Sequence, residues 1–188
     1  HRVHRRQRQM CIRDSPSTVA FPSRLKRAEY KTDMPDDIYR EFMDSLQNFH
    51  QLPYFRNAAT EIRNSKQSAS QFIEAGARIG VGTDAASPLN MHLEAIWREM
   101  SALVDSGMTP IQAISAATKT NAEILGVFAQ RGSLEPGKQA DILVVAGNPL
   151  EDIEVLGRVA LVAKGGAMWI TENSTLEVNG PVNHFQNP

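Results

Sequence analysis

The sequence has little of several features that would narrow its class. Its single cysteine, Cys11, cannot form an internal disulfide bond, so cysteine usage does not indicate whether the protein resides in an oxidising or a reducing compartment. It contains no run of 18 apolar residues, which excludes a membrane-spanning helix. A formal net charge of −1 gives no reason to expect binding to nucleic acid or to a membrane surface. With 41% hydrophobic and 22% charged residues, the 188-residue chain has the composition of a soluble globular protein with a core.

Residues 1–31 differ from the rest of the chain. They carry nine Lys or Arg and two acidic residues, a net charge of +7 that leaves −8 for the remainder. A basic arm for nucleic acid is one interpretation, and a disordered, non-native leader joined to a truncated reading frame is the other. We favour the leader, because a cluster of basic residues without helical or strand periodicity needs no binding partner to explain it. We expect trypsin to remove residues 1–31 before it cleaves the rest of the chain. No apolar signal-peptide segment follows, so the cytoplasm is favoured, although a signal could lie upstream of this sequence.

Apolar residues at three- and four-residue steps predict helices in the middle of the chain. The expected ranges are 36–52, 69–75, 87–106 and 110–125, with glycine ends at Gly76, Gly107 and Gly126. The last helix has the clearest start, because Thr109 can act as N-cap and Gln112 completes a capping box. Residues 54–67 are polar and mixed, and are predicted to hold at most a short helix.

Residues 77–83 form an apolar run of strand length, relieved by glycine, that ends at a single carboxylate, Asp84. The order helix, buried strand, acidic residue, helix is typical of an α/β unit with parallel strands. In such folds the C-terminal strand ends form the ligand-binding face. We therefore expect a buried strand with Asp84 at its end in a concave, partly open site. From these residues alone, an ordinary turn aspartate remains the alternative.

After Gly132 the periodicity changes from helical to strand-like. The strand candidates are Leu134 and residues 142–145, 159–163 and 168–170, with turns at Pro136-Gly137 and Gly165-Gly166. Residues 132–138 nearly match a phosphate-binding loop, but Gln139 stands where Ser or Thr would bind magnesium and a strand follows. We therefore interpret this stretch as a turn, without nucleotide binding.

A series of short motifs in one order resembles the C-terminal part of the metal-dependent amidohydrolase superfamily, in its branch similar to imidazolonepropionases and Xaa-Pro dipeptidases. The series covers roughly residues 60–170. Its motifs are Gly82-Thr83-Asp84-Ala85, His92-Leu93-Glu94, Gly107-Met108-Thr109-Pro110, Ala113-Ile114-Ser115-Ala116-Ala117-Thr118, Ala122-Glu123-Ile124-Leu125-Gly126, the stretch 132–145, and Gly147-Asn148-Pro149-Leu150.

The resemblance implies an α/β fold, the C-terminal part of a (β/α)₈ TIM-like barrel with part of a small β-sandwich. The barrel part would occupy residues 32–131, with its last strand and flanking helices, and the sandwich strands residues 132–170. Residues 171–188 would form a frayed tail. A whole barrel needs about 250 residues, so we expect this chain to be an incomplete fragment of a longer enzyme.

The resemblance also implies hydrolysis of carbon–nitrogen bonds in small-molecule amides, including dipeptides, by metal-activated water. It implies one or two divalent metals, with zinc the expected ion and Asp84 as metal ligand and general base. A metal lowers the pKa of bound water from about 16 to about 7, so a nearby carboxylate can accept that proton. His92 and Glu94 are expected to bind substrate, and Glu94 could instead hold the Asp84 loop. An ordinary surface helix turn is the alternative for both.

The expected metal site is incomplete in this sequence. The resembled family needs a His-x-His on its first strand and further histidines, and His1, His4, His50 and His184 do not provide them. We therefore expect the chain by itself to be inactive. A non-catalytic structural or interaction protein on the same fold is the alternative, and the presence or absence of upstream histidines separates the two. The substrate and the oligomeric state are not predicted.

Overall fold

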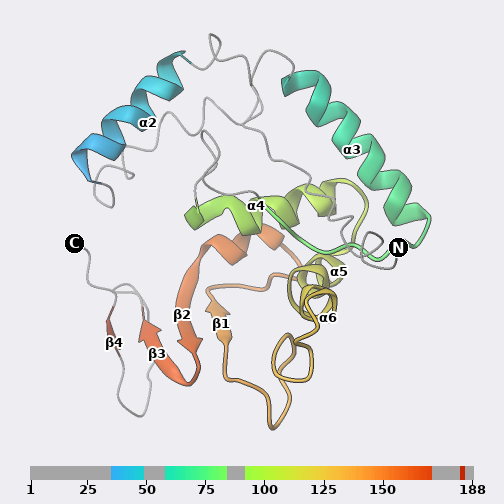
Figure 1. Ribbon diagram of the computed structural model, residues 1–188, viewed down its shortest axis with the longest axis vertical. Coiled ribbons are helices and arrows are strands. Elements are labelled where there is room, and N and C mark those ends of the chain that lie inside the picture. Colours follow the sequence, from blue (N-terminus) through green and yellow to red (C-terminus); the bar gives the residue numbers. More distant parts are fainter. Residues whose placement is uncertain (1–34, 49–57, 84–91, 171–182, 185–188) are drawn as a thin grey trace.

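The computed structural model describes residues 35–48, 58–83, 92–170 and 183–184 (Figure 1). Its helical elements are α2 (Asp36–Asn48), α3 (Ala58–Glu74), α4 (His92–Asp105), α5 (Pro110–Ser115), the π-helical turn η4 (Ala116–Thr120), α6 (Asn121–Ile124) and the 3₁₀ helix η5 (Ile153–Gly157). Its strands are β1 (Ile142–Val145), β2 (Val159–Lys164), β3 (Ala167–Ile170) and β4 (Asn183–His184). None of the described helices is long and apolar enough to cross a membrane.

The three predicted glycine helix ends are confirmed. After α3, Gly76 has φ of 66°, its N–H donates to Ile73 C=O at 3.0 Å, and the N–H of Ala77 donates to Phe72 C=O at 2.9 Å. These are the two hydrogen bonds of a Schellman motif, in which a glycine adopts the left-handed conformation. The same pair of bonds ends α4 at Gly107 and α6 at Gly126.

The predicted capping box at the start of α5 is also confirmed. The Thr109 N–H donates to Gln112 Oε1 at 2.8 Å, and the Gln112 N–H donates back to Thr109 Oγ1 at 3.4 Å. Two helix N–H groups that have no partner inside the helix are satisfied in this way.

Helix α3 is longer than the sequence predicted, because its first half carries no apolar stripe. It runs for 17 residues, and the good helix formers Arg63, Lys66 and Gln67 lie on its exposed face. Two contacts join it to the end of α4: Lys66 Nζ lies 3.2 Å from Asp105 Oδ2, and Ser70 Oγ donates to Ser106 C=O at 2.8 Å. Tertiary contact therefore supports a helix that periodicity alone did not indicate.

The prediction of a strand at residues 77–83 is wrong for the structure as described. The segment is irregular, although Ile79 and Val81 are buried. A strand exists only where its backbone bonds to a neighbouring strand, and no described strand lies beside this run. The backbone N–H and C=O of Val81 bond to the side chain of Asn121 instead.

The core lies where α3, the run 77–83, α4, α5 and η5 meet. Figure 1 shows α4 crossing the middle of the molecule, with η5 beneath it. Leu103 of α4 is fully buried at the centre, and the other buried members of the cluster are Ala69, Ile79, Val81, Met100, Ala113, Ala116 and Ile153. The segment that leads to Asp84 is therefore part of the core.

The strands form a single four-stranded sheet in the order β1-β2-β3-β4. The first three are antiparallel, and β3 pairs with β4 in parallel. The predicted strands at 142–145, 159–163 and 168–170 are confirmed to within one residue at each end. The turn between β2 and β3 has φ of 57° at Gly165 and 87° at Gly166, as a two-residue hairpin with two left-handed positions requires.

The C-terminal region differs from expectation in two respects, and the expected part of a β-sandwich stays a prediction, since the described strands form one sheet. Leu134 is 78% exposed in a loop and not in a strand, because Gly132 at φ of 98° turns the chain there. Asn183 and His184, within the tail expected to fray, pair with Trp169 and Ile170.

Candidate functional site

The predicted catalytic residue is not part of the described structure. The structure describes residues up to Thr83 and again from the backbone of His92 onward. Asp84 and the side chain of His92 therefore lie outside the described residues. Their roles remain predictions. The structure does describe the chain on both sides of this region, namely the buried run before Asp84 and helix α4 after it.

The run is held by a side-chain amide from a distant helix. Asn121 Oδ1 accepts the Val81 N–H at 3.1 Å, and Asn121 Nδ2 donates to the Val81 C=O at 2.8 Å. The same Nδ2 lies 3.4 Å from the C=O of Ala117 on its own helix. One side chain therefore makes the two bonds that a neighbouring strand would make, at a position three residues before Asp84.

This contact requires a glycine at position 80. A Cβ built on Gly80 would lie 2.8 Å from Ile124 Cδ1, and closer still to Asn121 Oδ1. Real Cβ atoms essentially never approach other heavy atoms this closely. The absence of a side chain at Gly80 therefore lets α6 approach the run closely enough for the amide of Asn121 to reach it.

The π-helical turn η4 sets which side of the helix faces the run. The sequence predicted one regular helix over 110–125, whereas residues 116–120 have the wider π-helical bonding. An extra residue in an α-helix rotates every later side chain by about 100° around the axis. The turn directly precedes Asn121, so it fixes the rotation at which Asn121 and Ile124 meet the run.

On α4, Glu94 is held by Arg98 one turn later. Arg98 Nε donates to Glu94 Oε2 at 2.8 Å, and Arg98 Nη2 lies 2.7 Å from the same oxygen. Both side chains are less than 15% exposed, and the guanidinium lies 4.6 Å from the centre of the Trp97 ring. The i, i+4 spacing of the two residues favours such an ion pair on a helix, and its burial fixes the carboxylate more firmly than exposure to solvent would.

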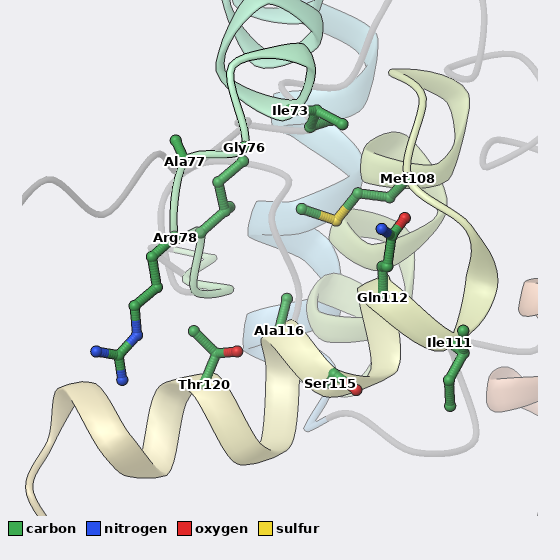
Figure 2. A pocket seen from close by; sticks show the side chains of 11 residues that line it. Ile73, Gly76, Ala77, Arg78, Met108, Ile111, Gln112, Ser115, Ala116 and Thr120 are labelled. Atoms are coloured by element: carbon green, nitrogen blue, oxygen red, sulfur yellow. The ribbon is translucent and has the colours of Figure 1, made fainter.

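A hollow of about 350 Å³ lies at the other end of the run (Figure 2). Figure 2 shows Ala77 and Arg78 on one side of it and Met108 and Gln112 on the other. Its remaining lining residues are Ile73, Gly76, Ile79, Ile111, Ser115, Ala116 and Thr120. Arg78 is paired with Glu123 at 2.6 Å, and the lining contains no carboxylate, histidine or cysteine. This hollow therefore lacks acid–base groups, and it does not extend to residues 81–83.

Carboxylates with a lowered pKa lie beside the sheet, away from the run. The Gly165 N–H, which bonds to Asp141 Oδ1 at 2.9 Å, lowers the pKa of Asp141, and Lys164 and Arg131 add to this effect. The Ser133 hydroxyl and Lys138 lower the pKa of Glu135. These contacts stabilise both carboxylates in their charged form, which makes each a weaker base than a carboxylate with its ordinary pKa.

The described residues do not contain a metal site. Across residues 35–48, 58–83, 92–170 and 183–184, no three His, Cys, Asp or Glu side chains are grouped so that they could hold a metal ion. The donor set expected of an amidohydrolase is therefore not met by this part of the chain.

Sequence reasoning did not identify Asn121. One signal was present, because asparagine is unfavourable inside a helix and often bonds to backbone groups. An asparagine in the middle of a predicted helix among small residues indicates a side chain with a specific partner. The identity of that partner, 40 residues earlier, required the structure.

Comparison with known proteins places these features in a family. The model of the amidohydrolase family matches residues 45–168. The ochratoxinase of Aspergillus niger is 38% identical over 103 residues, which is 52% of this chain and 20% of that protein. The imidazolonepropionase of Thermoplasma acidophilum is 32% identical over 88 residues, 47% of this chain and 21% of that protein.

Solved structures agree with the sequence matches. A Xaa-Pro dipeptidase with methionine bound in its active site has a TM-score of 0.55 and 35% identity, over 60% of this chain and 27% of that chain. The crystal structure of the A. niger ochratoxinase has a TM-score of 0.50 and 33% identity, over 58% of this chain and 25% of that chain. This chain thus spans about a fifth of the curated relatives named above and about a quarter of these solved chains. Since the family model matches well over half of its residues, the chain belongs to the amidohydrolase family.

Proposed function

We propose that this chain is part of a metal-dependent hydrolase of carbon–nitrogen bonds in small amides, with Asp84 as metal ligand and general base. Membership of the amidohydrolase family supports the reaction class. The names of its relatives point the same way, because a Xaa-Pro dipeptidase and an imidazolonepropionase act on dipeptide and cyclic amide bonds.

One observation carries the role of Asp84. The backbone three residues before it is buried and bonded on both its N–H and its C=O, so the residue that follows Thr83 starts from a fixed point. A catalytic group needs a fixed backbone of this kind, because a misplacement of about 1 Å can cost a factor of about 100 in rate.

In this proposal Asp84 accepts the proton of the attacking water and returns it to the leaving nitrogen. The metal would supply Lewis-acid activation when bound. The described residues do not form its ligand set, so the further ligands would come from the rest of the full-length protein. His92 and Glu94 remain proposed substrate contacts, with Glu94 oriented by Arg98.

The test uses the full-length enzyme and its Asp84→Asn variant, which keeps the shape of the side chain and removes the base. Both are assayed for hydrolysis of Xaa-Pro dipeptides, N-acyl amino acids and a cyclic amide, with zinc supplied. Loss of a general base lowers the rate by about 100-fold or more. Asp105→Asn is the matched control, because Asp105 is exposed at the end of α4 and pairs with Lys66. Full activity in Asp84→Asn would remove the proposed role.

The same assay separates the enzyme from the non-catalytic alternative. Turnover by the wild-type full-length protein supports the enzyme, whereas a protein that binds no zinc and turns over none of these amides supports an interaction protein on this fold. The 188-residue chain alone should show no zinc-dependent hydrolysis. Zinc is held by several protein ligands, and Asp84 is the one ligand that we propose in this chain. Zinc-stimulated turnover by this chain would refute the argument from an incomplete site.

A further inference from the structure

We infer that Asn121 is a positioning residue for catalysis. It fixes the position of the backbone at Val81, three residues before Asp84. The inference rests on the proposed function of Asp84 and adds a residue that acts on the reaction without touching the substrate. Its basis is the pair of hydrogen bonds between the Asn121 amide and Val81, together with the contact at Gly80.

The amide makes a two-point contact with a single residue. A bond of 3.1 Å to the Val81 N–H and one of 2.8 Å to its C=O fix both the position of this residue and its rotation about the chain axis. A single bond or an apolar contact would leave that rotation free. Val81 is 5% exposed, so water does not readily replace either bond.

The amide is itself held in place. Its Nδ2 also lies near the C=O of Ala117, and Ile124 on the same helix packs against Gly80 beside it. A Cβ on Gly132 would lie 3.2 Å from the Thr118 C=O, so the loop that follows the helix packs closely on the π-helical turn. This close contact restricts movement of the helix.

The fixed point is close enough to Asp84 to matter. Three residues span at most about 10 Å even when fully extended, so a shift or rotation at Val81 displaces the point from which the chain continues to Asp84. Residues that orient a catalytic ligand without touching the substrate typically contribute about 10- to 100-fold in activity. A role in packing alone would instead change the stability and leave the kinetics of the folded enzyme unchanged.

The experiment compares Asn121→Ala with Asn148→Ala in the full-length enzyme, using the amide that the wild type hydrolyses best. Asn148 is the matched control, because its side chain bonds within its own loop to Leu150 N–H and to Glu151. We measure kcat and KM well below the unfolding temperature, and hydrogen exchange of the peptide that spans residues 77–91. Asn121→Ala should lower kcat by about 10- to 100-fold, change KM less than threefold and speed exchange. Asn148→Ala should change none of these quantities.

Gly80→Ala is the second variant, in case Asn121→Ala does not fold. It displaces the same amide from the opposite side, and it should reproduce the fall in kcat with little change in KM. A folded Asn121→Ala or Gly80→Ala enzyme with kcat within threefold of the wild type would overturn the inference.

Failure of the proposed function would look different. In that case Asp84→Asn keeps its activity, or the wild type hydrolyses none of the amides, and a catalytic role for Asn121 is overturned with it. If Asp84→Asn is inactive while Asn121→Ala is fully active, the proposed function stands and only the positioning role fails.

Discussion

The contact between Gly80 and the helix that carries Asn121 makes a measurable prediction for stability. Gly80→Ala adds one methyl group where Ile124 Cδ1 would lie 2.8 Å away and Asn121 Oδ1 closer still. If the core shifts to make room, overpacking lowers the free energy of unfolding by about 1–3 kcal/mol. If Asn121 instead rotates away, its two hydrogen bonds to Val81 are lost, at about 1 kcal/mol each. Alanine has less conformational entropy than glycine in the unfolded chain, which offsets about 0.4–1 kcal/mol of this cost. We expect a net loss of about 1–2 kcal/mol in the free energy of unfolding.

The assay is urea unfolding of the 188-residue chain at pH 7, followed by tryptophan fluorescence. Two relief variants test the cause: Asn121→Ala removes the amide, and Ile124→Val removes the Cδ1 atom that the new methyl group meets. In either background the cost of Gly80→Ala should fall by roughly 1 kcal/mol, as expected for residues in direct contact. Gln67→Ala is the control, because Gln67 is exposed on α3 and alanine is compatible with the helix there.

Two results would refute this reasoning. One is a Gly80→Ala chain as stable as the wild type, which would mean that the helix can move away at no cost. The other is strict additivity of Gly80→Ala with both relief variants, which would mean that the loss arises elsewhere.

Three further predictions concern the rest of the molecule. Leu103→Ala should destabilise the chain by about 2–5 kcal/mol in urea unfolding, because Leu103 is fully buried in the core; a loss below 1 kcal/mol would contradict this. Thr109→Ala should cost about 1 kcal/mol through loss of the capping box, and Thr109→Ser should restore most of it. The pKa of Asp141 is lowered by its bond from Gly165, so its stabilisation is present above its unfolded pKa and lost as the pH falls through the folded value. Asp141→Asn should therefore be less stable than the wild type at pH 7, and the difference in urea midpoint should shrink as the pH falls below about 4; a constant difference would count against it.

Features that depend on local chemistry could be predicted from the residues alone. Gly76, Gly107 and Gly126 end helices because only a residue without Cβ adopts the left-handed conformation at low cost. The capping box at Thr109 and the hairpin turn at Gly165 were likewise readable, since each depends on residues a few positions apart. The family was readable for the same reason, as a series of such motifs in fixed order.

Features that depend on distant partners emerged only in the folded chain. The run 77–83 is apolar enough for a strand, but a strand needs a neighbour, and the described partner of Val81 is the amide of Asn121. Periodicity also did not show the π-helical turn, because the helix that follows it, Asn121–Ile124, is too short for a rotation of about 100° to appear as a shift in the hydrophobic pattern. Local patterns fixed where elements end, and the contact across 40 residues fixed how the segment before Asp84 is held.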